Sequence, residues 1–283
     1  MKIADAMTPR SEVVTAELPG TRDEALEHLK RGSFSSMPVV KKEDGDEEFR
    51  GLISRQDLIE RPDEDQLALL VREGPTASKG ASIEELARLM VEENTRRVPV
   101  VDGTLEGIVT ITDVIRAIAD GAVETDATAG DVAGRDVNTT YAGTPLAVAE
   151  REIHYANDPY TVVLDDEGEM AGMLTEVDVI EVAEVVEGEE ETGDSIADQD
   201  DEWMWEGIKA VGSRYFPTRN VEFPEGPVSE FMTGDVVSVS TSKPVAEVAR
   251  EMIRHDVEQV PLLDGGDLAG IVRDMDLLSA VGQ

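Results

Sequence analysis

GIVTITD at residues 107–113 is the stretch that decides the fold, because the chain repeats its pattern. The pattern is a glycine, two apolar residues, and an aspartate six positions after the glycine. The four copies are GLISRQD at 51–57, GIVTITD at 107–113, GMLTEVD at 172–178 and GIVRDMD at 270–276. Recurrence of this kind predicts a protein built from repeats of about 55 residues each.

A short apolar strand precedes each copy, and a hydroxyl residue lies 23 positions before the start of that strand. The strands start at Pro38, Pro99, Val162 and Pro261, and the hydroxyl residues are Thr15, Thr76, Thr139 and Ser238. Between hydroxyl and strand, apolar residues recur at helical spacing, most clearly over 83–91. The predicted repeat is therefore strand, helix, strand, strand, helix.

Local signals mark both ends of the first helix of each repeat. The starts carry capping-box or first-turn residues, namely Thr21 with Glu24, Ser82 with Glu85, Pro145 and Pro244. The ends are marked by Ser33, Asn94, Asn157 and Asp256. A repeat of this size buries little apolar surface when it folds alone. We therefore expect repeat 1 to pack with repeat 2 and repeat 3 with repeat 4.

The predicted class is α+β, with four βαββα repeats arranged as two pseudo-twofold tandem pairs. The repeats span 1–61, 69–120, 127–185 and 227–283. They resemble cystathionine-β-synthase (CBS) domains, whose usual pattern is a VxT-like first strand, an amphipathic helix, a PVV strand and a G-[IL]-[VI]-[TS]-x-x-D-[LV] segment. The departures are an acidic insertion at 41–50, Val162 in place of proline, and Arg273 where the other repeats have Ser54, Thr110 and Thr175.

The resemblance implies an adenine-type ligand, such as AMP, ADP, ATP or S-adenosylmethionine, bound in clefts between paired repeats, with no cofactor required. A hydroxyl can donate to a phosphate or ribose oxygen, and a carboxylate three residues later can accept two ribose hydroxyls. The turn before the last helix also offers backbone N–H groups to a phosphate. The candidate ligand-binding residues are Thr15, Ser54, Asp57, Thr76, Arg97, Thr110, Asp113, Thr139, Thr175, Asp178, Ser238 and Asp276.

Several of these residues have a second interpretation that needs no ligand. Each motif aspartate stands just before an apolar helical run, where it would also serve as an N-cap. Arg97 is placed to meet a phosphate in repeat 2, where repeat 1 has Ser36, but Arg96 and Arg97 could equally be surface charges. Arg273 either closes the repeat 4 pocket or reaches a phosphate. We do not expect all four sites to be occupied.

The charge balance restricts the partners. The chain carries 62 acidic and 25 basic residues and a formal net charge of −37, which repels nucleic acids and anionic membranes. We interpret this as a halophilic protein of a high-salt cytoplasm, where screening weakens the self-repulsion. Disulfides are excluded because cysteine is absent, and neither a signal peptide nor a membrane span is recognisable.

Residues 186–226 break the repeat pattern with an acidic linker followed by an aromatic-rich insertion. The insertion holds Trp203, Trp205, Lys209, Arg214, Tyr215, Phe216, Arg219 and Phe223. These side chains either pack over repeats 3 and 4 or form a contact site for a partner or a phosphate.

The sequence offers no pattern for catalysis. HExxH, GxSxG and P-loop motifs are absent, and His28, His154 and His255 lie at different offsets from the strands, so they predict no recurrent metal site. We therefore expect a regulatory, homodimeric binding module for an adenine-type small molecule that signals to a regulated protein. The alternative is a ligand-free scaffold or oligomerisation module.

Overall fold

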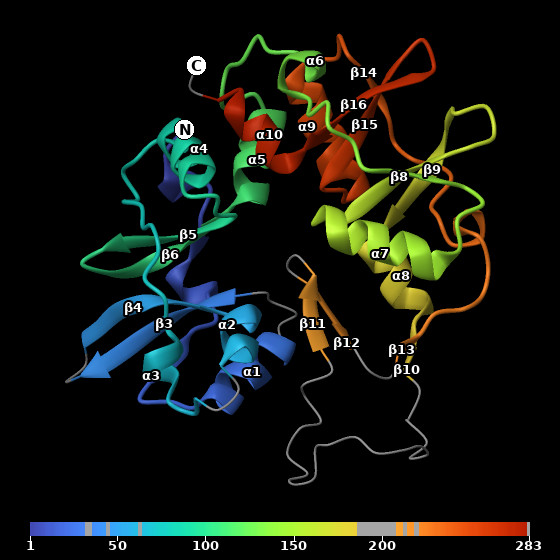
Figure 1. Ribbon diagram of the computed structural model, residues 1–283. Helices are drawn as coiled ribbons and strands as arrows, with labels where there is room; N and C mark the ends of the chain where they lie inside the picture. Colours follow the sequence, from blue (N-terminus) through green and yellow to red (C-terminus); the bar gives the residue numbers. More distant parts are fainter. Residues whose placement is uncertain are drawn as a thin grey trace, which may run out of the picture. The chain divides into compact units, whose positions relative to one another are not determined.

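The computed structural model describes residues 1–31, 36–43, 46–61, 64–185, 208–211, 214–217 and 221–281 (Figure 1). These residues form four α+β repeats, each with a small sheet and flanking helices. The chain divides into two compact lobes. The first lobe contains Met1–Gly134, Val237–Leu262 and Gly270–Gln283, and the second contains Arg135–Val236 and Leu263–Ala269.

Repeats 1 and 2 lie entirely in the first lobe. Repeat 1 contains η1 (Ile3–Asp5), β1 (Thr8–Pro9), η2 (Arg10–Glu12), β2 (Ala16–Leu18), α1 (Arg22–Arg31), β3 (Ser36–Glu43), β4 (Asp46–Ser54) and α2 (Arg55–Glu60). After α3 (Leu67–Leu70), repeat 2 contains α4 (Ile83–Glu92), β5 (Arg97–Asp102), β6 (Thr104–Thr110) and α5 (Ile111–Ala119).

The remaining elements follow α6 (Ala129–Val132). Repeat 3 contains β7 (Thr139–Tyr141), α7 (Leu146–Ala156), β8 (Tyr160–Leu164), β9 (Met170–Thr175) and α8 (Glu176–Val182). Then come β10 (Glu184–Val185), β11 (Ile208–Val211), β12 (Arg214–Pro217), β13 (Val221–Glu222) and η3 (Val228–Glu230). Repeat 4 contains β14 (Val239–Ser240), α9 (Val245–His255), β15 (Gln259–Asp264), β16 (Asp267–Arg273) and α10 (Asp274–Ser279), and its hairpin turn belongs to the second lobe.

The predicted strand order is present in repeats 1, 3 and 4. In repeats 1 and 3 the first strand runs parallel to the second, as in the pairing of Ala16 with Val39 and of Thr139 with Val162. Parallel neighbours need a crossover, which α1 and α7 supply. In repeat 2 the first strand was predicted wrongly: the sheet has the order β1-β6-β5, and Ala77, next to Thr76, makes only an isolated parallel bridge to Val100.

The predicted helix ends agree with the backbone where it is described. Asn94, Asn157 and Asp256 adopt left-handed conformations with φ of 47°, 56° and 53°, and the predicted capping boxes at Thr21 and Ser82 form. Pro145 and Pro244 are N-cap residues, one position before the first turn where we had placed them. Ser33 lies outside the described residues.

The acidic insertion of repeat 1 is part of its sheet. It lengthens β3 and β4 into a hairpin in which Lys41 faces Glu48 and Lys42 faces Glu47. The core of this repeat is apolar and closed, because helices α1, α2 and α3 cover the strands. Its buried residues are Ala16, Ala25, Leu29, Met37, Val39, Ile53, Leu58, Leu67 and Leu70.

The sheets exchange short segments between repeats. Thr8 pairs with Ile108, Arg72 with Leu52, Gly134 with Ile271 and Thr233 with Met173. We call residues 8–9, 72, 134 and 233 the exchanged segments. Each one therefore lies on the last strand of a repeat other than its own.

The exchanged segments explain the glycine of the motif. A Cβ at Gly51, Gly107, Gly172 or Gly270 would lie 2.4, 2.3, 2.5 or 2.7 Å from the carbonyl oxygen of Arg72, Thr8, Thr233 or Gly134, respectively. Real Cβ atoms do not approach oxygen so closely, so only glycine admits the segment.

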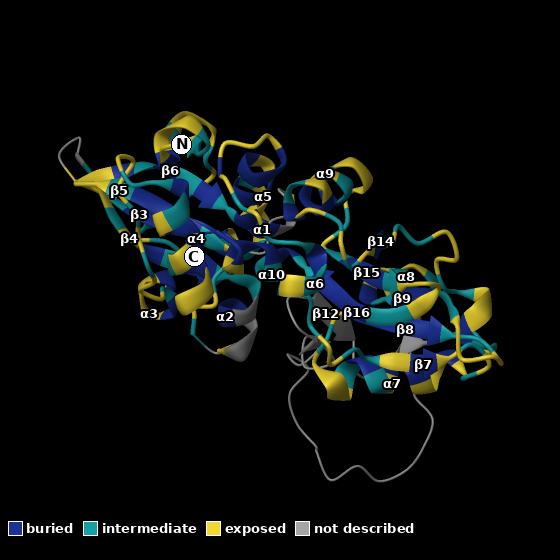
Figure 2. Cartoon of the chain, turned by 90° about the horizontal axis from the view of Figure 1, so that it is seen from above, coloured by how far each residue is buried: buried dark blue, intermediate teal, exposed yellow. Residues whose placement is uncertain are grey.

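Helices of repeats 2 and 4 pack together within the first lobe. Helix α5 lies against α9, and α10 lies against both α4 and α5. Figure 2 shows α5 mostly in the colour of buried residues, in agreement with its buried Val114, Ile115 and Ile118. Repeat 4 is thus tied to repeat 2 through an apolar helix interface.

The aromatic-rich insertion is described only in part. Trp203, Trp205 and Arg219 lie outside the described residues, and β11 and β12 form an antiparallel hairpin whose backbone alone is described. Phe223 packs against the apolar core of repeat 3, as the packing interpretation predicts. For the other side chains of the insertion, both interpretations stay predictions.

Candidate functional site

In repeats 1, 2 and 3, the hydroxyl and the aspartate of the motif bind one another at the start of the last helix. In repeat 2, Thr110 donates to Asp113 Oδ2 from its backbone N, at 2.8 Å, and from its Oγ1, at 2.9 Å. The same pair of bonds joins Ser54 to Asp57, at 2.8 and 2.5 Å, and Thr175 to Asp178, at 2.8 and 2.7 Å. These are capping boxes, which satisfy backbone donors at a helix start.

The prediction that the aspartates are N-caps was wrong by three positions. The N-caps are Ser54, Thr110, Thr175 and Arg273, and Asp57, Asp113, Asp178 and Asp276 occupy the third helical position. The reason is that a carboxylate has the reach to accept the N–H of the N-cap residue from one turn away. Local helix capping therefore accounts for the recurrence of the hydroxyl and acid pair.

The surroundings of the aspartates differ between the repeats. Arg72, in an exchanged segment, forms an ion pair with Asp57 Oδ1. Thr233, in another, donates from Oγ1 to Asp178 Oδ1 at 3.4 Å. Asp113 instead meets Arg116 of its own helix at 3.5 Å. In repeat 4 the N-cap residue Arg273 turns back, and its Nε lies 3.5 Å from Asp276 Oδ2.

Four candidate or related residues meet where repeats 1 and 2 join. Arg97 donates from Nη1 to Ser36 Oγ at 3.4 Å, which brings the starts of β5 and β3 together. Ser36 faces Ser54 across its sheet, and Arg97 faces Thr110. All four side chains are half-buried. We call Ser36, Ser54, Arg97 and Thr110 the junction residues.

The junction holds a partly desolvated positive charge. Burial is the largest influence on Arg97 and lowers its pKa, the neighbouring charge of Arg96 lowers the pKa further, and Glu258 opposes both effects. Desolvation disfavours a charged guanidinium, so an anion at this place would be held more strongly than one at an exposed arginine.

Arg96 has a different role from Arg97: it is exposed, as a surface charge would be, but it also forms ion pairs with repeat 4. It donates from Nη1 to Asp274 Oδ1 at 3.1 Å, and its Nη2 lies 3.2 Å from Glu258. Asp274 is 4% exposed, and this burial raises its pKa. The charge of Arg96, the next largest influence, acts in the opposite direction. Arg96 therefore ties repeat 2 to repeat 4 within the first lobe.

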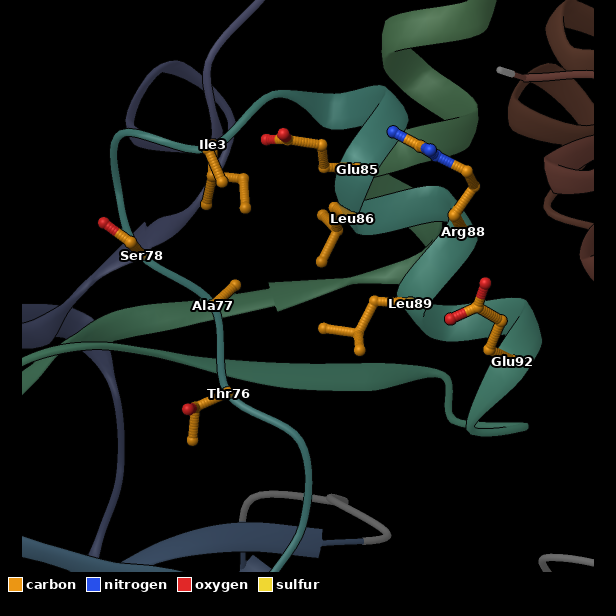
Figure 3. Close-up of a pocket in the computed structure, with 10 residues that line it drawn as sticks. Ile3, Thr76, Ala77, Ser78, Glu85, Leu86, Arg88, Leu89 and Glu92 are labelled. Atoms are coloured by element: carbon orange, nitrogen blue, oxygen red, sulfur yellow. The ribbon is translucent and has the colours of Figure 1, made fainter. Parts of the chain in front are cut away.

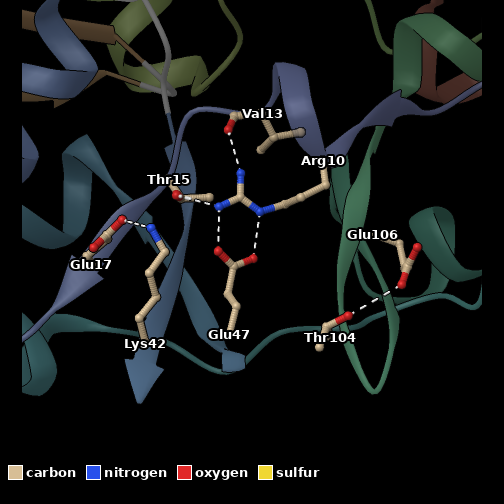
Figure 4. Close-up of polar contacts among 8 residues, drawn as sticks. All are labelled: Arg10, Val13, Thr15, Glu17, Lys42, Glu47, Thr104 and Glu106. Atoms are coloured by element: carbon tan, nitrogen blue, oxygen red, sulfur yellow. Dashed lines mark hydrogen bonds and ion pairs between the residues drawn. The ribbon is translucent and has the colours of Figure 1, made fainter. Parts of the chain in front are cut away.

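Thr15 has its hydroxyl engaged outside the junction. Arg10 donates from Nη2 to Thr15 Oγ1 at 3.2 Å and forms two bonds of 2.6 Å with Glu47 (Figure 4). The hydrogen bond from Arg10 lowers the pKa of Glu47 and raises that of Arg10. Sequence reasoning missed Arg10 and Glu47, since 37 residues separate them.

Thr76 lines a separate open pocket of about 400 Å³ in repeat 2. The pocket lies between residues 76–81, Ile3 and helix α4, and Figure 3 shows Leu86 and Leu89 pointing into it while Arg88 points away. No motif aspartate lines it. Thr139 and Ser238 are exposed, and no described contact brings either hydroxyl to a motif aspartate.

Within the described ranges, no group of three or more histidine or acidic side chains could hold a metal ion. Of the helices that the structure describes, none has the length and apolar content needed to cross a membrane.

Comparison with known proteins places this geometry in a family. The CBS domain family matches residues 3–64, 69–120, 129–184 and 228–283. The chain is 24% identical over 281 residues to the uncharacterised protein MJ1404 of Methanocaldococcus jannaschii, covering 99% of this chain and 61% of that protein. It is 29% identical over 187 residues to MJ1225 of the same organism, covering 59% of this chain and 65% of that protein. The chain thus spans less than two thirds of either curated relative.

Two solved structures match the whole chain. The crystal structure of an uncharacterised conserved protein from Pyrococcus horikoshii has a TM-score of 0.69 and 28% identity, and the match covers 99% of this chain and 100% of that one. The crystal structure of MJ1225, described as a suggested archaeal homologue of g-AMPK, has a TM-score of 0.62 and 19% identity over 99% of both chains. The chain belongs to the CBS domain family and carries four CBS repeats.

Proposed function

We propose that the chain is a regulatory module that binds an adenine-type nucleotide where repeats 1 and 2 join. Arg97 would hold the phosphate, Thr110 and Ser36 would donate to phosphate or ribose oxygens, and Asp113 would accept the ribose hydroxyls. The observation that carries the proposal is Arg97, a half-buried cation set beside hydroxyls of both repeats in a chain of net charge −37. Arginine suits phosphate because its planar donors match the phosphate oxygens.

The other candidate residues belong to the same proposal. Ser54 and Asp57, Thr175 and Asp178, and Asp276 would serve the other repeats, while the hydroxyls of Thr15, Thr76, Thr139 and Ser238 would lie beside base or sugar. In the structure Thr15 is bonded to Arg10, so this residue would have to exchange that bond for the ligand.

Regulation would follow from the link between repeats 2 and 4. Arg96 immediately precedes β5 and Arg97 is its first residue; Arg96 contacts Asp274 of repeat 4, while Arg97 contacts Ser36 of repeat 1. A nucleotide that fixes Arg97 would thereby favour one arrangement of the helices α4, α5, α9 and α10. A partner protein, or a second copy in a homodimer, would detect that arrangement.

The proposal is tested by ligand binding in high salt. A thermal-shift screen with AMP, ADP, ATP and S-adenosylmethionine should show stabilisation of about 2.7 kcal/mol at 100 times the dissociation constant. Asp113→Ala should then weaken binding by about 1.5 kcal/mol or more, which is at least about tenfold.

Asp131→Ala is the matched control. Asp131 forms the same capping box with Thr128, at 2.8 and 2.7 Å, but belongs to no motif. Loss of a cap alone would affect both variants similarly, so weaker binding only in Asp113→Ala supports the ribose role. Unchanged affinity in both variants would contradict it.

The second candidate function is a ligand-free scaffold. It is favoured by the capping boxes, because they explain the recurring hydroxyl and acid without a ligand. Stabilisation by none of the four compounds would select this function.

A further inference from the structure

We infer that the exchanged segments decide which motif aspartate is open to a ribose, and that Arg72 closes the site of repeat 1. This inference rests on the proposed nucleotide binding and adds to it which of the sites are filled. It is carried by a difference between repeats that share the same capping geometry.

In repeat 1 both carboxylate oxygens of Asp57 are in use. Ser54 takes Oδ2 with two hydrogen bonds, and Arg72 takes Oδ1 with an ion pair. Asp57 is only 7% exposed. Arg72 is itself 56% exposed, but a ribose would have to displace its guanidinium from direct contact with a buried carboxylate, which would then lose its charge partner.

Repeat 4 also has an arginine beside its motif aspartate, from a different chain position and in a longer contact than in repeat 1. The exchanged segment on its last strand has Gly134, which offers no side chain, and the guanidinium of Arg273 lies 3.7 Å from the place of the missing Cβ. Arg273 Nε lies 3.5 Å from Asp276 Oδ2. In repeats 1 and 4 an arginine therefore lies where the exchanged segment meets the motif aspartate.

The exchanged segments that lie on the last strands of repeats 2 and 3 carry threonines, Thr8 and Thr233 respectively. Thr233 meets Asp178 only through a hydroxyl at 3.4 Å, which leaves the carboxylate its charge. Asp113 meets Arg116 at 3.5 Å, the same distance as Asp276 from Arg273, but Arg116 belongs to the helix of Asp113 and not to the N-cap position or the exchanged segment. A ribose hydroxyl can replace either contact at little cost, because neither one is both close and buried.

The experiment counts AMP molecules per chain by equilibrium dialysis of the full chain in molar potassium chloride. Arg72→Thr copies the threonine of the other segments and should bind one more AMP per chain than the wild type. Adding Asp57→Ala to Arg72→Thr should abolish that gain. Arg88→Thr, at an exposed arginine bonded only weakly to the Glu84 carbonyl, is the matched control and should leave the count unchanged.

Arg273→Thr provides a second arm, since Asp276 is more exposed than Asp57 and tolerates loss of its arginine more easily. It should also add one AMP per chain. If the wild type binds AMP and both variants fold but keep the wild-type count, or bind less, the inference is wrong and the nucleotide function stands. If no variant and no wild type binds any of the four adenine compounds, both are overturned.

Discussion

Replacing Gly172 by alanine tests how firmly the exchanged segments require glycine. The new Cβ would lie 2.5 Å from the carbonyl oxygen of Thr233 and 2.9 Å from Sδ of Met232. The chain can keep the segment and accept strain, which costs about 1–3 kcal/mol in a packed site. It can instead release the segment and lose two backbone hydrogen bonds, Met173 to Thr233 at 3.0 Å and Thr233 to Met173 at 2.8 Å, at about 1 kcal/mol each.

The cheaper route limits the loss of local stability to about 2 kcal/mol, which corresponds to about 30-fold faster amide exchange. We expect this acceleration at the amides of Met173 and Thr233, measured by hydrogen exchange. Gly234→Ala is the control, because a Cβ there meets nothing within 4 Å, and it should change exchange by less than about threefold. Rates in Gly172→Ala within about twofold of the wild type would refute the steric reasoning.

Three further outcomes are expected. The pKa of Glu47 is lowered by Arg10, so its stabilising effect is present above the ordinary value of 4.5 and is lost as the pH falls through the lowered value. Thermal melts of Glu47→Gln should therefore lie below the wild type at pH 7, by up to about 1 kcal/mol, and converge with it in acid. Arg96→Ala should cost about 3 kcal/mol in chemical denaturation because it leaves Asp274 buried and unpaired, and adding Asp274→Leu should recover most of that loss. The unfolding midpoint should be higher in 3 M than in 0.1 M potassium chloride, since salt screens the net charge of −37; equal midpoints would contradict the halophile interpretation.

The sequence predicted the features that depend on neighbouring residues. Spacing predicted the four repeats and placed helix ends at Asn157 and Asp256, and both residues adopt the left-handed conformation that Asn and Asp tolerate. The exchanged segments were not predictable, because their distance from the hydroxyl residue of their own repeat is not constant. It is 7, 4, 5 and 5 residues in the four repeats. Their partners are chosen by sheet pairing between repeats, which no local pattern records.

Two adjacent residues show the same limit at the site. Arg96 and Arg97 could not be distinguished by composition, because both are arginines before one strand. Arg96 precedes β5 and Arg97 is its first residue, and in the structure Arg96 contacts Asp274, 178 residues away, while Arg97 contacts Ser36. Only the pairing of repeats shows that Arg96 connects repeat 2 to repeat 4 and that Arg97 connects repeat 2 to repeat 1.

The fourfold recurrence of the motif is weak support for ligand binding, because each repeat also needs the motif residues to form its own structure. Every repeat must start its last helix beside an exchanged segment, and this need alone retains the glycine for its close approach and the aspartate for its cap. Ligand binding should instead leave its mark where the repeats differ. Those positions are Arg72, Gly134 and Thr233 in the exchanged segments, and Ser36 and Arg97 at the junction, so substitutions there separate sensing from scaffolding more sharply than substitutions in the shared motif.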